Sequence, residues 1–420
     1  MREEIKQRIE QIKNGAVPDG YISTKAGVLP KWDCARINQI AEPITEKAGD
    51  GTYETLSISA GIGFVNQAKK FGKELSGKQY EKYTVLKQGY FSYNKGNSKT
   101  YPQGCIYRLK DRETAAVPNV FESFVVRKGN PDYYEQLFIS GFLNKQLSTK
   151  INHGVRDDGL LNLTGKDFYS CYLPVPPLEE QQKIAEILMQ CDKVIELKQK
   201  RIEEEKKLKK ALMQKLLNPD SGIRLPGFKC EWKKTCIGDI TELYSGGTPK
   251  SSEIENYADE SGIPFIRSGE ISSTYTELFL SEIGYKNSSA KMVKKGDLLY
   301  ALYGANSGDC FISKMDGAIN QAILCIKSKS EDIRYIYYVL SNSREKITSI
   351  YLQGGQGNLS ATIIKKLKID LPSPEEQRAI VSALNSKDTI IENLEKELEQ
   401  WQHKKKSLMQ LLLTGIVRVK

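Results

Sequence analysis

Pro176-Pro177-Leu178-Glu179-Glu180-Gln181-Gln182 opens a stretch of the chain that occurs a second time as Pro372-Ser373-Pro374-Glu375-Glu376-Gln377-Arg378. The two copies stay at a constant offset of 196 positions (376 − 180 = 196), and both end in a Leu-Met-Gln turn. That turn is Leu212-Met213-Gln214 in the first copy and Leu408-Met409-Gln410 in the second. An internal repeat of this length indicates a chain built from two related halves.

Each copy is predicted to form one long helix. The box Ser373-Pro374-Glu375-Glu376 is typical of a helix start, with proline at the first helical position. Apolar residues then follow steps of three and four, which indicates a coiled-coil seam. About 40 residues would make a rod of roughly 60 Å. The predicted seam residues are Ile184, Leu188, Cys191, Ile195, Ile202, Leu212 and Leu216 in the first helix, and Ile380, Leu384, Ile391, Leu394, Leu398, Trp401, Leu408 and Leu412 in the second. The charged residues that interrupt these seams are Lys198, Glu205 and Lys209 in the first helix, and Lys387 and Lys405 in the second.

The composition is that of an ordinary water-soluble protein. At 420 residues the chain is too long for one core, so at least two domains are expected. No apolar run reaches membrane-spanning length, and the polar start at Met1 is unlike a signal peptide, so a cytoplasmic location is expected. The formal net charge of +10 is compatible with nucleic-acid binding. The 8 cysteines form no Cys-x-x-Cys pair and only 2 histidines are present, which disfavours a zinc site.

The two segments that flank the first long helix are predicted to be diverged copies of one mixed α/β domain. Trp32, Ile37 and Ile40 match Trp232, Ile237 and Ile240 at an offset of 200 (232 − 32 = 200), whereas the loops do not match. One scaffold with unlike loops is typical of two recognition domains with different specificities. The predicted organisation is an N-terminal helix at 1–14, a first domain at 15–175, the first long helix at 176–218, a second domain at 219–371, the second long helix at 372–415 and a tail at 416–420. Single helices are predicted over Tyr133–Leu147 and Arg334–Thr348, and strands over Met292–Tyr303 and Gly317–Ile326.

An antiparallel arrangement of the two long helices is the simplest one for this order of elements. The second domain then connects the end of one helix to the start of the other without retracing about 60 Å. The predicted fold class is therefore α/β (α+β), with two similar mixed domains separated by antiparallel coiled-coil helices in internal pseudo-two-fold symmetry. A two-fold protein matches DNA half-sites at a fixed separation, and unlike domains predict unlike half-sites. Heptads alone would favour a coiled coil that joins two separate chains, but the flanking domain repeat favours an internal pair of helices.

With these features the chain resembles the specificity subunit of type I restriction–modification systems, over essentially all 420 residues. The doubled Pro…Glu-Glu-Gln helix carries the resemblance, together with two runs in the second domain. These runs are Tyr300-Ala301-Leu302-Tyr303-Gly304-Ala305-Asn306-Ser307-Gly308 and Ala318-Ile319-Asn320-Gln321-Ala322. The first domain departs from the pattern, with Ser92-Tyr93-Asn94-Lys95-Gly96-Asn97 in place of the first run.

The resemblance implies a non-catalytic subunit for DNA recognition. Each target-recognition domain would bind one half of a bipartite double-stranded DNA site. The long helices would separate the domains and bind two methyltransferase subunits, with two restriction (translocase) subunits as further possible partners. S-adenosylmethionine, ATP and Mg²⁺ would belong to those partners, and this chain would hold no cofactor and no metal.

Basic, amide-bearing and tyrosine-rich loops are the candidate DNA contacts. Lysine and arginine suit phosphates, while asparagine, glutamine and arginine read base edges. Tyr93-Asn94-Lys95-Gly96-Asn97-Ser98-Lys99 is expected to be an exposed turn. The candidates in the first domain are Lys69, Lys70, Lys73, Lys78, Tyr93, Asn94, Lys95, Asn97 and Lys99. Those in the second are Tyr244, Ser245, Thr248, Lys250, Arg267, Ser268, Tyr303, Asn306, Gln353 and Gln356. For each one, a solvated loop side chain is an equally good interpretation.

Catalytic motifs are largely missing from the sequence. Gly247-Thr248-Pro249-Lys250-Ser251 lacks the Gly-Lys pair of a phosphate-binding loop, and no Asn/Asp-Pro-Pro-aromatic tetrad of an amino-methyltransferase is present. Asp220, Glu231 and Lys233 imitate the Asp…Glu-x-Lys pattern of metal-dependent nucleases, which needs carboxylates that converge on Mg²⁺. A stand-alone nuclease is therefore the alternative enzyme, and a coiled-coil scaffold without DNA binding is the alternative non-enzyme.

Overall fold

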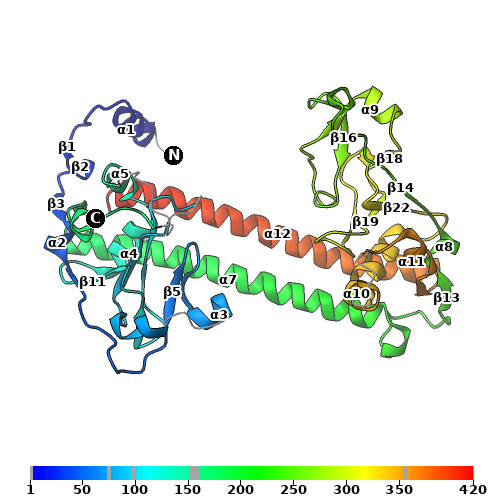
Figure 1. Ribbon diagram of the computed structural model, residues 1–420, viewed down its shortest axis with the longest axis horizontal. Coiled ribbons are helices and arrows are strands. Elements are labelled where there is room, and N and C mark those ends of the chain that lie inside the picture. Colours follow the sequence, from blue (N-terminus) through cyan, green and yellow to red (C-terminus); the bar gives the residue numbers. More distant parts are fainter. Residues whose placement is uncertain (1–2, 73–76, 97–99, 152–159, 353–357, 420) are drawn as a thin grey trace. The chain divides into compact units, whose positions relative to one another are not determined.

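The computed structural model describes residues 3–72, 77–96, 100–151, 160–352 and 358–419 (Figure 1). The chain folds as two compact units. Unit 1 is formed by Met1–Lys198 with Glu397–Lys420, and unit 2 by Gln199–Lys396. Each unit therefore contains one of the two predicted mixed domains and about half of each long helix. Among the described residues, no helix combines the length and the apolar character needed to cross a bilayer.

The two long helices form as predicted. α7 spans Leu178–Leu216 and α12 spans Pro374–Leu413 (Figure 1). In unit 1 the start of α7 packs against the end of α12, and in unit 2 the end of α7 packs against the start of α12. The helices are antiparallel in both units, because residues later in α7 pair with residues earlier in α12. The ion pairs that show this order are Asp192–Lys405 and Lys198–Glu397 in unit 1, and Lys206–Glu395 and Lys209–Asp388 in unit 2.

Most residues of the predicted seam are buried, and its charged interruptions form ion pairs between the helices. Lys198 binds Glu397 at 2.5 Å, and Lys387 binds Glu205 at 3.0 Å although Glu205 is only 5 % exposed. Pairing explains how charged groups occupy a seam, since an unpaired buried charge would be costly. The buried seam residues are Ile184, Leu188, Cys191, Ile202, Leu216, Ile380, Leu384, Ile391 and Leu412, and the half-buried ones are Ile195, Leu212, Leu394, Leu398, Trp401 and Leu408.

Unit 1 is built on a four-stranded antiparallel sheet in the order β4-β11-β8-β9. Phe91 and Phe124 face each other on neighbouring strands, with ring centroids 5.3 Å apart, and Phe138 packs edge-on to both. This aromatic core continues into Ile184 and Leu188 of α7. The strands are β1 Tyr21–Thr24, β2 Gly27–Pro30, β3 Asp33–Arg36, β4 Ala41–Pro43, β5 Leu56–Ser59, β6 Gly63–Asn66, β7 Thr84–Lys87, β8 Phe91–Asn94, β9 Cys105–Arg108, β10 Thr114–Val117, β11 Glu122–Val126 and β12 Tyr172–Val175. The helices are α1 Glu3–Lys13, α2 Ile37–Ile40, α3 Gln67–Phe71, α4 Pro131–Ile139, α5 Asn144–Ser148 and α6 Gly165–Tyr169, with a 3₁₀ turn over Gly77–Lys82.

Unit 2 has the equivalent four-stranded antiparallel sheet, β14-β22-β19-β20, and a second five-stranded sheet, β15-β17-β16-β21-β18. Its core continues into Met213 and Leu216 of α7 and into Ile380 and Leu384 of α12. The strands are β13 Lys233–Cys236, β14 Thr241–Ser245, β15 Tyr257–Ala258, β16 Ile263–Ile266, β17 Phe279–Leu280, β18 Lys291–Val293, β19 Leu298–Ala301, β20 Cys310–Ile312, β21 Gly317–Ile319, β22 Ile323–Ser328 and β23 Lys368–Leu371. The helices are α8 Ile237–Ile240, α9 Glu282–Lys286, α10 Ile333–Leu352 and α11 Ala361–Lys366, with 3₁₀ turns over Pro219–Ser221 and Ile254–Asn256.

The element order confirms that the two domains are copies of one scaffold. Both have the same four-stranded sheet, and the pairs β3–β12 and β13–β23 occupy equivalent positions in the chain. Ile37 and Ile237 are both fully buried on the matching helices α2 and α8. Thr164 and Ser360 both cap the helix that precedes the last strand of the domain. The five-stranded sheet belongs to unit 2, so the copies differ in what is inserted between framework elements.

Three elements that were predicted as continuous are interrupted in the structure, in each case by a glycine or a short turn. The helix predicted over Tyr133–Leu147 ends at Ile139, and Gly141 has φ +75°, which an α-helix cannot contain. The strand predicted over Met292–Tyr303 is split into β18 and β19 at Gly296, with φ +100°. The one predicted over Gly317–Ile326 is split into β21 and β22.

The Glu-Glu-Gln motif anchors the start of each long helix to its own domain. Glu180 accepts hydrogen bonds from the Trp32 indole at 3.1 Å and from Arg418 at 2.7 Å. Glu376 accepts the equivalent bonds from Trp232, at 3.1 Å, and from Arg224. The second glutamate of each motif is thus a buried carboxylate paired with one arginine and one tryptophan.

The glutamine of each motif connects the long helix to a helix of the sheet domain. Gln181 donates to Pro176 O at 2.8 Å, and its Oε1 accepts from the Asn130 backbone N–H at the start of α4. Gln377 donates to Pro372 O at 3.0 Å and accepts from the Asp332 N–H at the start of α10. α4 and α10 are therefore equivalent helices, docked in the same way on α7 and α12.

Candidate nucleic-acid interface

In unit 2, the candidate residues lie in loops that follow framework strands. β16 and β21 are parallel, so their carboxyl ends meet at one edge of the five-stranded sheet. The loop after β16 carries Arg267 and Ser268, and the residue two positions after β21 is Gln321. Tyr303 and Asn306 follow β19 of the neighbouring sheet. Loops held by rigid strands are the usual position of binding residues.

Two glycines let the loop after β14 pass close to its neighbours. A Cβ at Gly246 would lie 1.7 Å from the backbone oxygen of Ile319, and one at Gly247 would lie 1.9 Å from Ser289 Oγ. Only glycine fits such positions. The close approach brings the exposed Thr248 beside Gln321, whose Oε1 accepts a hydrogen bond from the Thr248 hydroxyl at 2.6 Å.

The side chain of Gln321 also lies close to that of Tyr303: burial raises the pKa of Tyr303, and Gln321 acts to lower it. On the other side of this region, a Cβ at Gly269 would lie 3.7 Å from Asn306 Nδ2, so the loop after β16 passes close to the loop after β19. We call this set the unit-2 patch: Thr248, Arg267, Ser268, Tyr303, Asn306 and Gln321. Its exposed or half-buried hydroxyl, amide and guanidinium groups are the kinds of side chain that read base edges.

Arg267 is held firmly within the patch. Its Nη2 contacts Glu270 at 2.8 Å and Glu277 at 2.7 Å, and its backbone N–H also binds Glu270. Burial acts to raise the pKa of Glu270, but these bonds and that from Thr276 outweigh it and lower the pKa to about 2. The same carboxylates raise the pKa of Arg267, so both partners are charged at neutral pH.

The remaining candidates of the second domain lie apart from these contacts. The hydroxyl of Tyr244 donates to Met292 O at 2.9 Å, so this half-buried side chain supports the sheet. Ser245 is exposed at the end of β14, and Lys250 forms an exposed ion pair with Glu253 at 3.2 Å. Gln353 and Gln356 lie outside the described residues.

In unit 1 the candidates come together around the end of β5. Lys70 of α3 and Asn94 at the end of β8 both donate to the backbone oxygen of Ile58, at 3.3 and 3.4 Å. Lys69 is exposed on the same short helix. Lys73, Asn97 and Lys99 lie outside the described residues, and the side chain of Lys78 is likewise not described.

The exposed turn expected from Tyr93 onward is wrong at its start. Tyr93 is fully buried in β8, where it stacks on Phe168 and its hydroxyl donates to Gln103 O. Lys95 is 16 % exposed and forms an ion pair with Glu122 at 3.1 Å. Tyr93 therefore contributes to the core of the domain, and Lys95 already has an acidic partner.

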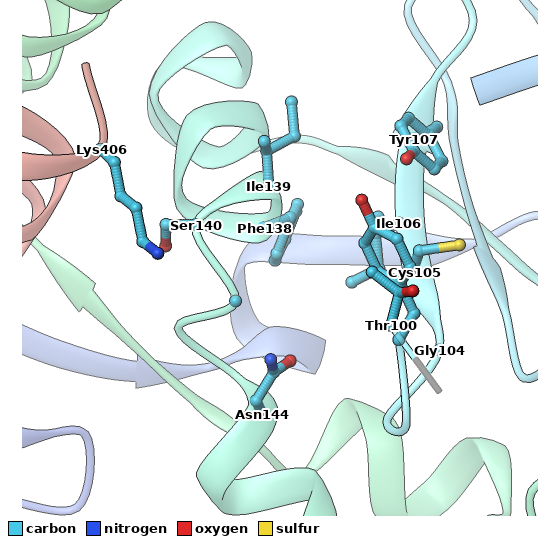
Figure 2. A pocket seen from close by; sticks show the side chains of 12 residues that line it. Thr100, Gly104, Cys105, Ile106, Tyr107, Phe138, Ile139, Ser140, Asn144 and Lys406 are labelled. Atoms are coloured by element: carbon cyan, nitrogen blue, oxygen red, sulfur yellow. The ribbon is translucent and has the colours of Figure 1, made fainter. Parts of the chain in front are cut away.

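A cavity of about 370 Å³ lies in unit 1 between β9, the end of α4 and α12 (Figure 2). Figure 2 shows Cys105 and Tyr107 on one wall, Ser140 and Asn144 on another, and Lys406 approaching from α12. Burial raises the pKa of Cys105 to about 11, so its thiol is protonated at neutral pH and unsuited to nucleophilic attack.

The residues of the alternative nuclease pattern occupy ordinary structural positions. Asp220 belongs to the exposed 3₁₀ turn after α7, where Asn218 caps its N–H, and Lys233 begins β13. Within the described ranges, His, Cys, Asp and Glu side chains nowhere gather in a group of three or more that could hold a metal ion.

Sequence reasoning missed the central residue of the unit-2 patch. Gln321 connects Thr248 and Tyr303, which are separated by 55 positions (303 − 248 = 55). The available signal was its place in the run Ala318–Ala322, which carried the family resemblance, but the sequence analysis placed Gln321 inside a strand predicted over Gly317–Ile326. The contact between Gln321 and Thr248 depends on how closely Gly246 and Gly247 approach Ile319 and Ser289, and no local sequence pattern predicts that approach.

Comparison with known proteins gives a consistent family. The model of the family described as "Type I restriction modification DNA specificity domain" matches residues 41–206 and 229–400. The putative type I restriction enzyme MjaX specificity subunit of Methanocaldococcus jannaschii is 34% identical over 267 residues, which cover 59% of this chain and 60% of that protein. The MjaVIII specificity subunit of the same organism is 32% identical over 281 residues, covering 62% of this chain and 66% of that protein. The chain thus aligns with less than two thirds of each relative's length.

Solved structures support the fold. A chain from a structure concerning complex assembly and conformational transition of the type I R-M system superposes with a TM-score of 0.59 at 17% identity, covering 93% of this chain and 99% of that one. The type I restriction–modification S subunit from M. genitalium superposes with a TM-score of 0.56 at 16% identity, covering 91% and 96%. At such identities the likeness concerns the fold alone.

Proposed function

Because the chain belongs to the type I restriction–modification DNA specificity family, we propose that it binds a bipartite, asymmetric DNA site with one half-site per domain. The observation that carries the proposal is one framework with unlike loops. β4-β11-β8-β9 and β14-β22-β19-β20 are the same sheet. The second domain adds to it a five-stranded sheet that supports Arg267 and Gln321, whereas the described part of the first domain has the two-stranded pairs β5-β6 and β10-β7. Because the two frameworks are alike, both domains should dock on DNA in the same way. Because their loops differ, the two domains should read different base sequences.

The chemistry of the unit-2 patch supports base reading by that domain. Amide groups of Asn306 and Gln321 suit adenine, the Arg267 guanidinium suits guanine, and hydroxyls of Thr248 and Tyr303 suit several edges. In the first domain, Lys69 and Lys70 suit backbone phosphates. The chain itself specifies a DNA target and does not catalyse a reaction.

The partners in this proposal are two methyltransferase subunits and, where restriction occurs, two translocating nuclease subunits. S-adenosylmethionine, ATP and Mg²⁺ belong to those subunits, and the complex acts on double-stranded DNA in the cytoplasm. The two methyltransferase subunits would bind equivalent regions of the long helices, because both helices begin in the same way: the second motif glutamate binds one tryptophan and one arginine.

Domain exchange tests the proposal. The segment 15–175 is replaced by the equivalent segment of another such subunit, and the complex with its methyltransferase is expressed in cells. Methylation-aware sequencing should recover a motif with one new half-site and one unchanged half-site. The reciprocal exchange of 219–371 is the control and should alter the other half alone. If both halves change in either exchange, or no bipartite motif is recovered from the wild type, the proposal is wrong.

A further inference from the structure

One ion pair between a lysine and an aspartate of the two long helices occurs twice, with its equivalent residues 196 positions apart, as in the helix repeat. It was not part of the predicted Glu-Glu-Gln motif. In unit 2, Lys209 of α7 binds Asp388 of α12 at 2.5 Å. In unit 1, Lys405 of α12 binds Asp192 of α7 at 2.5 Å. The two aspartates are 196 positions apart (388 − 192 = 196), and so are the two lysines (405 − 209 = 196). Other ion pairs of the rod, such as Lys198–Glu397, have no such counterpart, because Leu394 occupies the position equivalent to Lys198.

The second oxygen of each aspartate accepts a hydrogen bond from the sheet domain. Gln136 of α4 donates to Asp192 Oδ2 at 2.9 Å, and the Tyr338 hydroxyl of α10 donates to Asp388 Oδ2 at 2.6 Å. Gln136 lies six positions after Asn130, and Tyr338 lies six positions after Asp332, the residues whose N–H groups the motif glutamines bind (136 − 130 = 6; 338 − 332 = 6). Different side chains thus make the same contact at equivalent positions.

Burial makes each contact well defined. Gln136 is 2 % exposed and Tyr338 is 1 % exposed. Lys209 also lies over the Tyr338 ring, 5.3 Å from its centroid, so that lysine, tyrosine and aspartate restrain one another. The Oε1 atom of the buried Gln136 has no partner among the described residues, which costs free energy. A leucine, which has a similar size, would avoid that cost in place of Gln136. The hydrogen bond to Asp192 is therefore the favourable interaction that glutamine makes there and leucine could not.

We propose that these two clusters, Asp192–Lys405–Gln136 and Asp388–Lys209–Tyr338, are positioning joints that fix the angle of each recognition domain on its long helix. The proposal rests on the proposed function, since the angle matters only if each domain reads a half-site. Each domain helix is held at two points along the long helix, first at the motif glutamine and then at the joint. The hydrophobic core that joins each domain to the long helices packs without strong directionality, whereas hydrogen bonds at these two points are directional and fix the rotation. The joints would therefore determine how strictly the complex selects the number of base pairs between the half-sites.

The test removes the domain side of a joint and measures spacer selectivity. Tyr338→Phe removes one hydroxyl from the joint of unit 2, and Gln136→Leu removes the amide from the joint of unit 1. Tyr337→Phe is the matched control: this tyrosine is the neighbour of Tyr338 and lies near Asp388, but its side-chain hydrogen bond is to Ser341 on its own helix. The complex of each full-length variant with its methyltransferase is assayed on duplexes that carry the wild-type motif with its own spacer and with one base pair more or fewer. Thermal unfolding is recorded in parallel.

Each joint variant should lower the rate ratio between the correct and the altered spacers roughly tenfold, the factor expected for one hydrogen bond to a charged group. The half-site sequences should stay unchanged, and Tyr337→Phe should keep the wild-type ratio. A joint variant that melts earlier but retains wild-type spacer selectivity would show a merely structural contact and overturn the proposal. Failure of the wild-type complex to modify any bipartite motif would instead refute the proposed function, so the two failures are distinguishable.

Discussion

Glu376 is the most buried acidic residue of the repeated motif, and its neighbour Glu375 is largely exposed, with an exposed ion pair to Arg378. Glu376 is 1 % exposed and binds Arg224 and Trp232, whereas the side chain of Glu375 is 65 % exposed. Removing one partner of a buried pair leaves the other charge uncompensated. Glu376→Gln should therefore lower the free energy of unfolding by about 2–4 kcal/mol. Glu375→Gln should stay within about 0.5 kcal/mol of the wild type. Denaturant titration of both variants checks this, and equal effects would contradict it.

Glu270 gives a prediction about pH. Its folded-state pKa of about 2 lies below the ordinary value of 4.5, so the folded protein binds fewer protons than the unfolded chain in this range. The contribution of Glu270 is thus fully present above about pH 4.5 and is lost as the pH falls towards 2. Because the site is partly exposed, solvent screening should reduce it to on the order of 1–2 kcal/mol. Glu270→Gln should weaken the acid dependence of the melting temperature below pH 4.5, and an unchanged slope would refute this.

The sequence predicted which stretch repeats, but not what the repeated residues bind. Glu376 was identified as part of a helix start, which is a local property of four consecutive residues. Its partners Trp232 and Arg224 lie 144 and 152 positions away, so only the fold brings them to it. Tyr93 shows the same limit of local reasoning. The polar residues around it predicted an exposed turn, but its side chain is buried in the core.

Ile391 is a buried residue of the seam between α7 and α12, and its neighbour Ile390 is exposed. Ile391 is 7 % exposed and Ile390 is 39 % exposed. Ile391→Asp would bury an unpaired carboxylate in unit 2 and should lower the unfolding free energy by several kcal/mol. Ile390→Asp is the matched control and should cost well under 1 kcal/mol. Leu394→Asp, at a half-buried seam position, should fall between the two. Melting curves that rank the variants in another order would show that the seam is packed differently.

Long periodic elements were predictable and short interrupted ones were not. The periodicity of α7 and α12 extends over about ten turns each, so local exceptions such as Lys198 do not obscure it. β18 and β19 were predicted as one strand because apolar residues lie on both sides of the Lys294–Asp297 turn, in which Gly296 adopts a φ of +100°. The unit-2 patch was foreseen in five of its six residues, as loop candidates without known contacts. Their grouping depends on sheet order, which a single sequence does not reveal.

The boundary between the two compact units crosses both long helices near their middle. Unit 1 ends at Lys198 on α7 and resumes at Glu397 on α12, and these two residues form an ion pair at 2.5 Å. An insertion after Lys200 of α7, matched by one after Lys396 of α12, therefore adds length at the boundary and leaves the anchors and joints of each unit intact. If the rod positions the two recognition domains, its length should act as a ruler for the spacer between the half-sites.

Four residues inserted into both helices should lengthen the rod by about 6 Å and add a rotation of roughly 40° beyond a full turn. DNA rises about 3.4 Å per base pair, so the preferred spacer should grow by about two base pairs if the rod lies along the DNA, and by less if it is inclined. Both half-sites should keep their sequences, because the loops after β14, β16, β19 and β21 are untouched. Insertion into one helix alone shifts the seam on one side of the boundary and should destabilise the protein more than the paired insertion does. Methylation-aware sequencing of DNA from cells that carry each variant gives the spacer directly. Full activity with an unchanged spacer would show that the partner subunits position the domains and that the rod does not.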